Sequence, residues 1–277
     1  MPVSTRDRIE RLLRLYHHRL RLVINPDARR APRVVANSVP KAGSHLLARC
    51  LTLMGIVNSR QHVHYLHPRE KIERAFAHLK PGEYLTAHLP YLPFVEELMR
   101  ARGARMVVII RDPRDVVVSH FHYVTYKDRH HRLRDYYRRL PDDHARLMTS
   151  IRGIDPPAGQ EHLRLPDVNE RFRGVLAWQE HGAHVVRFED MVGPQGGGDA
   201  HKQRDAIRGI GEYLGLPMPS TRVEEVAARL FHTKSATFRK GTIGDWRNHF
   251  TEEHKRAFKE IAGDLLVELG YERDTNW

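Results

Sequence analysis

The hydrophobic residues of the chain form short continuous runs that alternate with stripes at helical spacing. Continuous apolar runs are typical of strands that are buried on both faces of a parallel sheet. They predict strands at 34–39, 83–87, 105–110 and 184–188. The stripes predict helices at 45–53, 69–79, 116–126, 168–180, 204–214, 222–231 and 252–269. This alternation indicates a three-layer α/β fold, with a mainly parallel central sheet between layers of helices.

Four segments do not follow this alternation. Residues 4–25 predict an arginine-rich amphipathic helix, either docked on the surface or touching an anionic membrane. Residues 61–67 contain three histidines and predict a polar loop or a wall of a substrate site. Residues 127–165 predict a charged, partly helical excursion, which is either a lid or a basic–aromatic patch for nucleic acid. Residues 192–205 are glycine-rich and predict a flexible loop.

Composition narrows the class of protein. With 277 residues, of which 40% are hydrophobic, the chain can bury a core as one large domain or two small ones. No apolar run approaches the roughly 18 residues of a membrane span, and the N-terminal residues lack the apolar region of a secretory signal. Cys50 is the only cysteine, so an intrachain disulfide is impossible and a cytoplasmic location is expected. The net charge of +12 favours anionic ligands, from nucleotides to nucleic acid, acidic lipid or a sulfated product.

The first predicted strand leads into Pro40-Lys41-Ala42-Gly43-Ser44 and then directly into a helix. Such a loop directs backbone N–H groups toward one point at the positive end of a helix dipole. Lys41 adds a full charge and Ser44 a hydroxyl donor, so a phosphate or a sulfate is the expected occupant. The loop is not a Walker A motif, because its lysine precedes the single Gly43 and no Lys-Ser/Thr pair follows. We therefore expect an anion bound without a metal ion; the alternative is an ordinary strand–helix connection.

A second basic loop follows the strand at 105–110. Arg111 can bind a phosphate through two parallel N–H groups, or it can pair with Asp112 or Asp115. Ser119 lies about two turns further on, inside the predicted helix. Both interpretations of the arginine remain open from the sequence.

Two other groups of residues are candidates for chemistry. His88 stands where the strand at 83–87 stops, at the edge where parallel α/β sheets bind ligands, and it is either structural or catalytic. The glycine-punctuated segment with Arg239-Lys240-Gly241 is a third candidate anion site. The histidines of 61–67 do not predict a metal site, because no cysteine or suitably placed carboxylate accompanies them.

Four segments, in the order of the family, resemble the cytosolic-type sulfotransferases that use 3′-phosphoadenosine 5′-phosphosulfate (PAPS). Pro40-Lys41-Ala42-Gly43-Ser44 resembles the 5′-phosphosulfate loop, and the segment from Arg111 to Ser119 closely resembles the 3′-phosphate motif. Thr86-Ala87-His88-Leu89-Pro90 matches the segment that holds the catalytic histidine. The segment from Arg239 to Thr251 resembles the C-terminal signature. Any one of these matches could arise by chance, whereas all four in order are highly specific.

The resemblance implies one sulfotransferase domain over residues 1–277 with a P-loop NTPase-like fold. It implies an N-terminal helical extension over 1–30 and an acceptor-site lid over 120–165. The implied donor is PAPS, the product 3′-phosphoadenosine 5′-phosphate, and no metal ion is required. By position, the implied cofactor-binding residues are Lys41, Ala42, Gly43, Ser44, His45, Leu46, Arg111, Ser119, Phe188, Arg239, Lys240 and Gly241.

The chain departs from the family pattern mainly around the adenine. Leu46 stands where the family often has a tryptophan that stacks on the base, and Phe188 stands where it commonly has a tyrosine. The adenine-binding segment has no clean match near 231–238, and Thr86 replaces a frequent lysine. The dimer motif of the family is also broken near 247–256, so the oligomeric state stays open.

The expected reaction is in-line transfer of the sulfuryl group of PAPS to a hydroxyl or amine of a small-molecule or glycan acceptor. The resemblance implies His88 as general base, Lys41 as the stabiliser of charge on the bridging oxygen, and Ser119 as a restraint on Lys41. The expected walls of the acceptor site are 60–67, 89–94, 120–165 and the segment near 231–238. Their histidines, tyrosines and arginines favour a polar or anionic acceptor.

Two other functions are compatible with parts of the sequence. A nucleotide kinase with a degenerate phosphate loop would bind ATP with Mg²⁺, but the Walker lysine and hydroxyl pair is missing. A basic nucleic-acid-binding protein would explain the charge, but it would leave the ordered anion loops unexplained. We therefore expect a nucleotide donor and an acceptor as partners, and no nucleic acid or transmembrane anchor. Peripheral membrane contact through the basic first helix is the weaker alternative.

Overall fold

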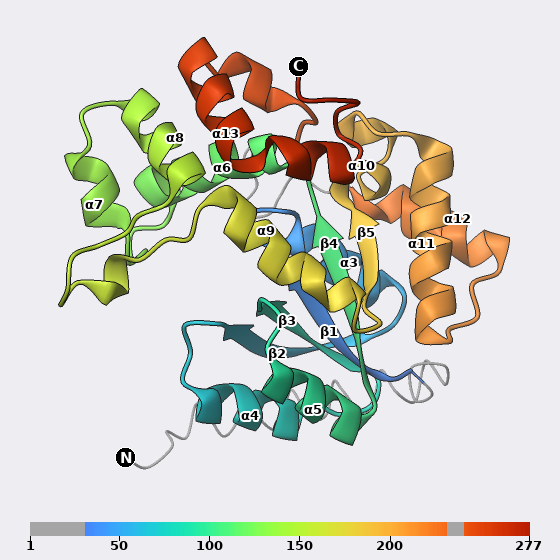
Figure 1. Cartoon of the computed structure of the whole chain (residues 1–277). Coiled ribbons are helices and arrows are strands. Elements are labelled where there is room, and N and C mark those ends of the chain that lie inside the picture. Colours follow the sequence, from blue (N-terminus) through green and yellow to red (C-terminus); the bar gives the residue numbers. More distant parts are fainter. Residues whose placement is uncertain (1–30, 232–240) are drawn as a thin grey trace.

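The computed structural model describes residues 31–231 and 241–277 and contains a five-stranded parallel sheet at its centre (Figure 1). The strands are β1 Arg33–Ser38, β2 Val57–His64, β3 Glu83–His88, β4 Ala104–Ile110 and β5 His184–Arg187. Their order across the sheet is β2-β3-β1-β4-β5, and every neighbouring pair is parallel. The chain leaves β1 and β4 in opposite directions, so their carboxyl ends flank the crevice where such sheets bind ligands.

Eleven α-helices lie within the described ranges. They are α3 Ser44–Leu53, α4 Arg69–His78, α5 Pro93–Arg102, α6 Pro113–His122, α7 Arg134–Arg139, α8 Asp143–Arg152, α9 Val168–Leu176, α10 Phe188–Met191, α11 Ala200–Leu214, α12 Ser220–Leu230 and α13 Glu252–Glu268. A π-helical turn, Tyr123–Lys127, follows α6, and short 3-10 turns lie at Glu161–Leu163, Ala177–Gln179, Pro194–Gly196 and Asp245–Asn248. None of these helices is both long and apolar enough to span a bilayer.

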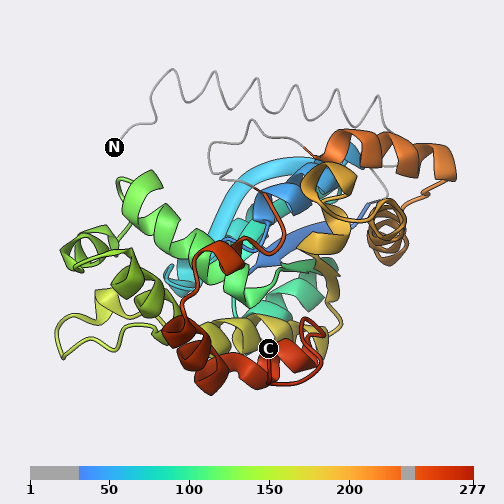
Figure 2. The same cartoon turned by 90° about the horizontal axis from the view of Figure 1, so that it is seen from above.

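The sheet is buried on both faces because successive side chains of its strands point to opposite sides. Val34 and Ala36 of β1 join a core cluster with residues of α3, α11 and α12. Val35 and Val39 join a second cluster with residues of α4, α5, α6, α8, α9 and α13. The view from above shows α9 and α13 together on one side of the sheet and α12 on the other (Figure 2). Helices pack on both faces of the sheet, so the central strands need apolar side chains on both sides, as their continuous apolar runs in the sequence indicate.

The predicted three-layer α/β architecture is confirmed, and the predicted strands lie close to their expected bounds. The expectation of a loop at 61–67 is wrong for its first half, because β2 continues to His64. His62 pairs with Thr86 and His64 with His88 of β3, so backbone pairing at the sheet edge outweighs the polar composition. The register shifts between Asn58 and His62, which accompanies the polar stretch.

Two further element boundaries differ from expectation. The loop predicted at 192–205 is already helical from Ala200, because Asp199 Oδ1 accepts from the N–H groups of His201 and Lys202 and caps α11. The helix predicted at 116–126, with Pro113 in its first turn, does begin at Pro113 but changes to a π-helical turn after His122. The helix predicted at 4–25 lies outside the described residues.

Candidate active site

The loop after β1 folds tightly and leads directly into the start of α3. Lys41 and Gly43 both have positive φ angles, 76° and 112°, which fold the loop back on itself. The first turn of α3 has no side-chain cap and no acidic residue. The initial N–H groups of a helix lack intrahelical partners, so an uncapped N-terminus attracts an anion. Ala42 differs from its neighbours: its buried N–H donates to Val39 O at 3.1 Å and closes the turn.

Gly43 lies against two side chains that leave no room for a Cβ atom. A Cβ at this position would lie 2.9 Å from Phe188 Cδ2 and 3.1 Å from Ile109 Cδ1. The Phe188 ring, at the start of α10, also lies 4.5 Å from Cζ of Arg111. Phe188 therefore connects the loop after β1 with the loop after β4.

Arg111 follows β4 and faces the same crevice. Its Nη2 donates to Asp115 Oδ2 at 3.1 Å and to Thr242 O at 2.8 Å. Its buried Nε has no hydrogen-bond partner. The pairing with Asp115 confirms one of the two interpretations from the sequence, and the unsatisfied Nε leaves a donor for a ligand.

Asp115 holds the C-terminal segment against the start of α6. Besides Arg111, it accepts from the backbone N–H groups of Gly244 and Trp246, both at 2.9 Å. These contacts bring Gly241 to the wall of the crevice. Arg239 and Lys240, predicted to bind the same phosphate, lie outside the described residues.

Asp112 and Arg114 of the same motif have structural roles. Asp112 caps α6 by accepting from Arg114 N at 2.9 Å, and the Arg114 side chain pairs with Asp112 and with Glu272. The buried guanidinium packs against the rings of both Trp246 and Trp277, with Cζ 4.1 Å and 4.6 Å from their centroids. In this motif Arg111 thus faces the crevice, whereas Asp112 and Arg114 stabilise the fold around it.

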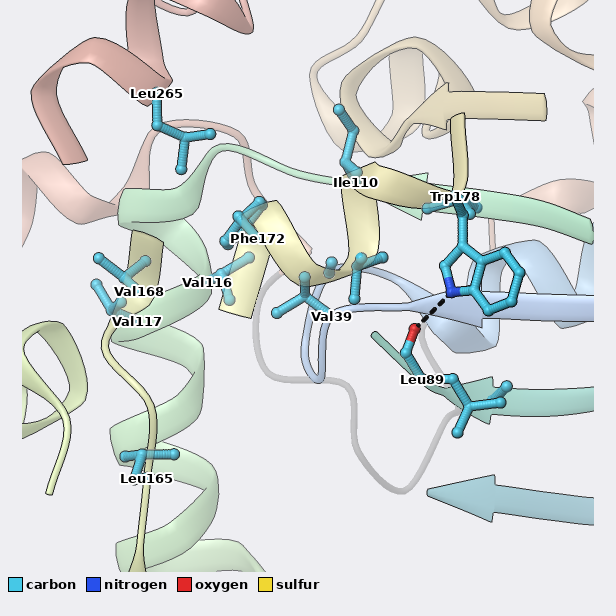
Figure 3. Close-up of a cluster of buried hydrophobic side chains, with 14 of the residues drawn as sticks. Val39, Leu89, Ile110, Val116, Val117, Leu165, Val168, Phe172, Trp178 and Leu265 are labelled. Carbon is cyan, nitrogen blue, oxygen red and sulfur yellow. Dashed lines mark hydrogen bonds between the residues drawn. The ribbon is translucent and has the colours of Figure 1, made fainter. Parts of the chain in front are cut away.

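His88, the last residue of β3, is held at the crevice by the end of β1. Its Nδ1 lies 2.9 Å from Ser38 O and 3.2 Å from Ser38 Oγ. Because a carbonyl only accepts, Nδ1 carries the proton and Nε2 is left as a base. The Asn37 side chain donates from Nδ2 to Leu89 O and accepts at Oδ1 from the N–H of Leu89. Trp178 Nε1 also donates to Leu89 O, at 3.1 Å (Figure 3).

The imidazole of His88 is neutral near pH 7. Burial lowers the pKa of His88 to about 4; the hydrogen bond to the Ser38 carbonyl opposes this effect, and the nearby His62, Lys41 and His45 add to it. The ring centroid of His62 lies 5.2 Å from that of His88. A neutral imidazole with an unprotonated Nε2 at the wall of a cavity can take a proton from a hydroxyl group.

These groups open onto one cavity of about 750 Å³, within the usual range of small-molecule sites. It is lined by nearly all the described residues that the sequence analysis selected: Lys41, Gly43, Ser44, His45, Leu46, His88, Arg111, Ser119, Phe188 and Gly241. The buried Ala42 is not among them. The positive groups and the base therefore share one site, as the sequence analysis required.

The other end of the cavity has a polar wall. Each expected acceptor-wall segment contributes described residues, and these include His62, His64, Tyr65, Pro90, His120, Tyr123, His131, Arg132 and Phe231. A further wall comes from α9, through Glu170, Arg171, Gly174 and Val175, which the sequence analysis did not select. Within residues 31–231 and 241–277 no cluster of three metal-ligating side chains is present.

Sequence reasoning missed several residues that build the site. Asn37 and Ser38 carry a detectable signal, because two polar residues interrupt an otherwise apolar strand end. Tyr123, whose ring lies 3.9 Å from Lys41 Nζ, and Arg171 carry none, since each resembles many tyrosines and arginines of the chain.

The chain is an α/β protein with the P-loop-like fold of the solved sulfotransferases. A model of the sulfotransferase domain family matches residues 10–270. The chain therefore belongs to this family and is a sulfotransferase enzyme. This membership does not favour the kinase or the nucleic-acid-binding alternative.

The relatives have low sequence identity to this chain, but the matches cover most of its length. Sulfotransferase 6B1 of Pan troglodytes is 26% identical over 269 residues, which are 86% of this chain and 80% of that protein. Sulfotransferase 6B1 of Danio rerio is 22% identical over 226 residues, 74% of this chain and 65% of that protein.

Two solved structures show the same fold. Mouse sulfotransferase SULT7A1 complexed with PAP has a TM-score of 0.59 at 20% identity, with 87% of each chain covered. Retinol dehydratase in complex with androsterone and inactive cofactor PAP has a TM-score of 0.57 at 16% identity, with 87% of this chain and 83% of that chain covered.

Proposed function

We propose that the protein transfers the sulfuryl group of PAPS to a hydroxyl or amine group of a small-molecule or glycan acceptor. The observation that carries the proposal is the opening of the α3 cradle, Arg111 and the unprotonated Nε2 of His88 onto one cavity. The family match and the two PAP complexes among the similar structures support the choice of donor.

The donor would be held at its two charged ends. Lys41, Ser44, His45 and the N–H group of Gly43 would bind the 5′-phosphosulfate at the start of α3. Ala42 would support this loop through its turn hydrogen bond to Val39.

The opposite end of the donor would lie beside the loop after β4. Arg111, with its unsatisfied Nε, and Ser119 would bind the 3′-phosphate. Arg239, Lys240 and Gly241 would close over this group. Leu46 and Phe188 would pack beside the nucleoside, in place of larger or hydroxylated rings.

The chemistry would depend on positioning and charge. PAPS supplies the sulfuryl group when bound and leaves as 3′-phosphoadenosine 5′-phosphate. Nε2 of His88 would accept the proton of the acceptor, which typically contributes about 10²–10⁴-fold in rate. Lys41 would stabilise the charge that grows on the bridging oxygen, with no metal ion required. That Ser119 restrains Lys41 stays a prediction; the structure also brings Lys41 into contact with the ring of Tyr123.

We further propose that residues 120–165 cover the acceptor end as a lid. The cavity is lined by four residues of this segment, His120, Tyr123, His131 and Leu165. Near the start of the segment, the π-helical turn Tyr123–Lys127 follows α6. The cytoplasmic location and residues 1–30 as an N-terminal extension also remain proposals.

The first test compares 3′,5′-ADP with ATP and Mg²⁺ in a thermal-shift measurement. We expect stabilisation by the 3′-phosphorylated nucleotide, independent of Mg²⁺; preference for ATP with Mg²⁺ would favour a kinase. Transfer from PAPS is then measured with an acceptor from a substrate screen. His88→Ala and Lys41→Ala should each lose most activity, whereas the exposed controls His78→Ala and Lys202→Ala should not. Turnover like the wild type in either site variant would refute the assigned role.

A further inference from the structure

Arg171 lies on α9, the helix that borders the residues directly after His88. The N–H of Tyr91 donates to Gly174 O at 2.6 Å and joins that segment to the helix. A Cβ at Gly174 would lie 3.0 Å from Cβ of Pro90, so the glycine permits this close approach. Arg171, one turn before Gly174, therefore forms part of the wall of the same cavity as His88.

The guanidinium of Arg171 is positioned by carbonyl groups and has no carboxylate partner. Its Nη2 donates to Ser150 O and its Nε donates to Asp167 O at 3.2 Å. Its Nη1 is buried and has no hydrogen-bond partner. In the described part of the chain no acidic side chain forms an ion pair with it. A buried cation with an unused donor is costly unless a ligand with negative charge meets it.

The acidic residues that line this end of the cavity have other partners. Asp128 accepts from the N–H of His130 at 2.9 Å. Glu170 pairs with Arg164 at 3.6 Å, and both side chains of that pair are mostly exposed. Arg132 adds a second positive charge to this end, with its N–H groups directed to carbonyl oxygens of the 162–164 turn. The charge balance here favours an anion.

The histidines of this wall do not add positive charge. Burial lowers the pKa of His64 to about 3, and burial also lowers the pKa of His120 well below its usual value, with Arg171 adding to the effect. Both imidazoles are therefore neutral near pH 7 and can contribute hydrogen bonds only. His120 Nδ1 lies 2.9 Å from Ser150 Oγ, while the carbonyl of Ser150 accepts from Arg171. The arginine is thus the buried charge of this wall, set in a fixed polar network.

We propose that Arg171 is a specificity-determining residue that binds a carboxylate on the acceptor while the hydroxyl group of the same molecule faces His88. This inference rests on the proposed sulfuryl transfer and identifies its substrate class as hydroxycarboxylates. In that transfer the acceptor oxygen forms a bond to sulfur and the bond from sulfur to the 5′-phosphate oxygen breaks. The hydroxyl proton passes to Nε2 of His88. The carboxylate makes no bond to sulfur; its contact with Arg171 sets the orientation of the hydroxyl group.

The test uses hydroxycarboxylates and their uncharged primary amides as matched probes. 4-Hydroxyphenylacetate and 6-hydroxyhexanoate are each compared with the corresponding amide, as acceptors with PAPS and as ligands of the protein loaded with 3′,5′-ADP. We expect the wild type to favour the carboxylates by about tenfold or more, because the carboxylate pairs with a desolvated donor. In Arg171→Gln this preference should fall to near one, and Arg171→Lys should restore part of it. Arg173→Gln, an exposed arginine of the same helix paired with Glu268, should keep the wild-type preference.

Other outcomes would overturn the inference and can be told apart from failure of the proposed function. Equal affinity for acid and amide, or binding of neither, contradicts an anionic acceptor if 3′,5′-ADP binds normally. An unchanged preference in Arg171→Gln contradicts the role of this residue, provided that the variant unfolds cooperatively and binds 3′,5′-ADP. If the wild type does not bind 3′,5′-ADP, the proposed function itself fails.

Discussion

Lys41 Nζ lies 3.9 Å from the centroid of the Tyr123 ring, so the loop after β1 and the turn after α6 meet inside the cavity. Tyr123 is the first residue of the π-helical turn Tyr123–Lys127, and its backbone still has the αR conformation that continues α6. A cation over an aromatic face is attracted by about 0.5–2 kcal/mol, depending on how far it is desolvated. Tyr123 therefore holds the ammonium group that is proposed to meet the leaving oxygen.

Replacement of the Tyr123 ring should slow transfer. Tyr123→Leu removes the attraction, and we expect kcat to fall by about 2- to 30-fold because Lys41 is less well positioned. Tyr123→Phe keeps the aromatic face and serves as the control, with kcat close to the wild type. Steady-state rates with saturating PAPS measure both, and an equal loss in the two variants would assign the effect to the hydroxyl group instead.

The pH dependence of transfer should reflect the lowered pKa of His88. A base must be unprotonated, and a pKa near 4 keeps His88 neutral throughout the usual pH range. We expect kcat/KM to show no loss from protonation of this group between about pH 8 and pH 5.5, and then to fall as the pH approaches 4. The measurement is kcat/KM against pH, with circular dichroism at each pH as a check on folding. An acid limb centred near pH 6.5, the ordinary value for histidine, would contradict the assignment.

Loss of Asp115 should destabilise the fold. Asp115→Ala removes the acceptor for Arg111 and for the N–H groups of Gly244 and Trp246, and leaves a buried cation unpaired. We expect the free energy of unfolding to fall by about 3–5 kcal/mol, as measured by urea denaturation. Glu73→Gln breaks the exposed pair with Arg69 and should change the free energy of unfolding far less, because solvent screens that pair. Similar losses in the two variants would contradict the anchoring role.

A methyl group at Gly43 should impair donor binding. Gly43→Ala introduces a Cβ at φ 112° and only 2.9 Å from the Phe188 ring, so the cradle has to move. We expect at least about tenfold weaker binding of 3′,5′-ADP in calorimetry, equivalent to roughly 1.4 kcal/mol.

Gly103→Ala provides the matched control for this substitution. Gly103 also has a positive φ, 57°, but a Cβ there would meet nothing within 4 Å, and the position is far along the chain from the cradle. Gly103→Ala should lose stability through backbone strain alone while keeping its affinity for the nucleotide. Equal affinity in Gly43→Ala and the wild type would contradict the proposed position of the anion.

The fold was predictable where the pattern of burial was strong. The runs at 34–39 and 105–110 are apolar because β1 and β4 lie in the middle of the sheet with helices on both faces. β2 was missed because it is an edge strand, with one neighbour and largely polar residues. β2 forms through backbone pairing with β3, and the side chains of β2 carry no sequence pattern that indicates this pairing.

The candidate site was predictable only where residues adjacent in the sequence determine the local backbone geometry. In Lys41-Ala42-Gly43-Ser44 the glycine, the charge and the start of a helix occur within a few residues, so the local sequence specifies an anion cradle. The motif from Arg111 to Asp115 was ambiguous, since it could pair internally or face a ligand. The structure contains both: Arg114 is used for packing, whereas Arg111 pairs with Asp115 and still faces the cavity.

The sequence by itself determined the α/β class, the basic loops at two strand ends and the histidine at a third, because strand burial and helix starts are encoded by neighbouring residues. Only the tertiary structure decided which distant side chains share the cavity. Ser38 meets His88 because β1 and β3 are paired in the sheet, although 50 residues separate them in the chain. Tyr123 contacts Lys41, and Arg171 lines the same cavity, because of how the helices pack. Such contacts between distant residues leave no local pattern in the sequence.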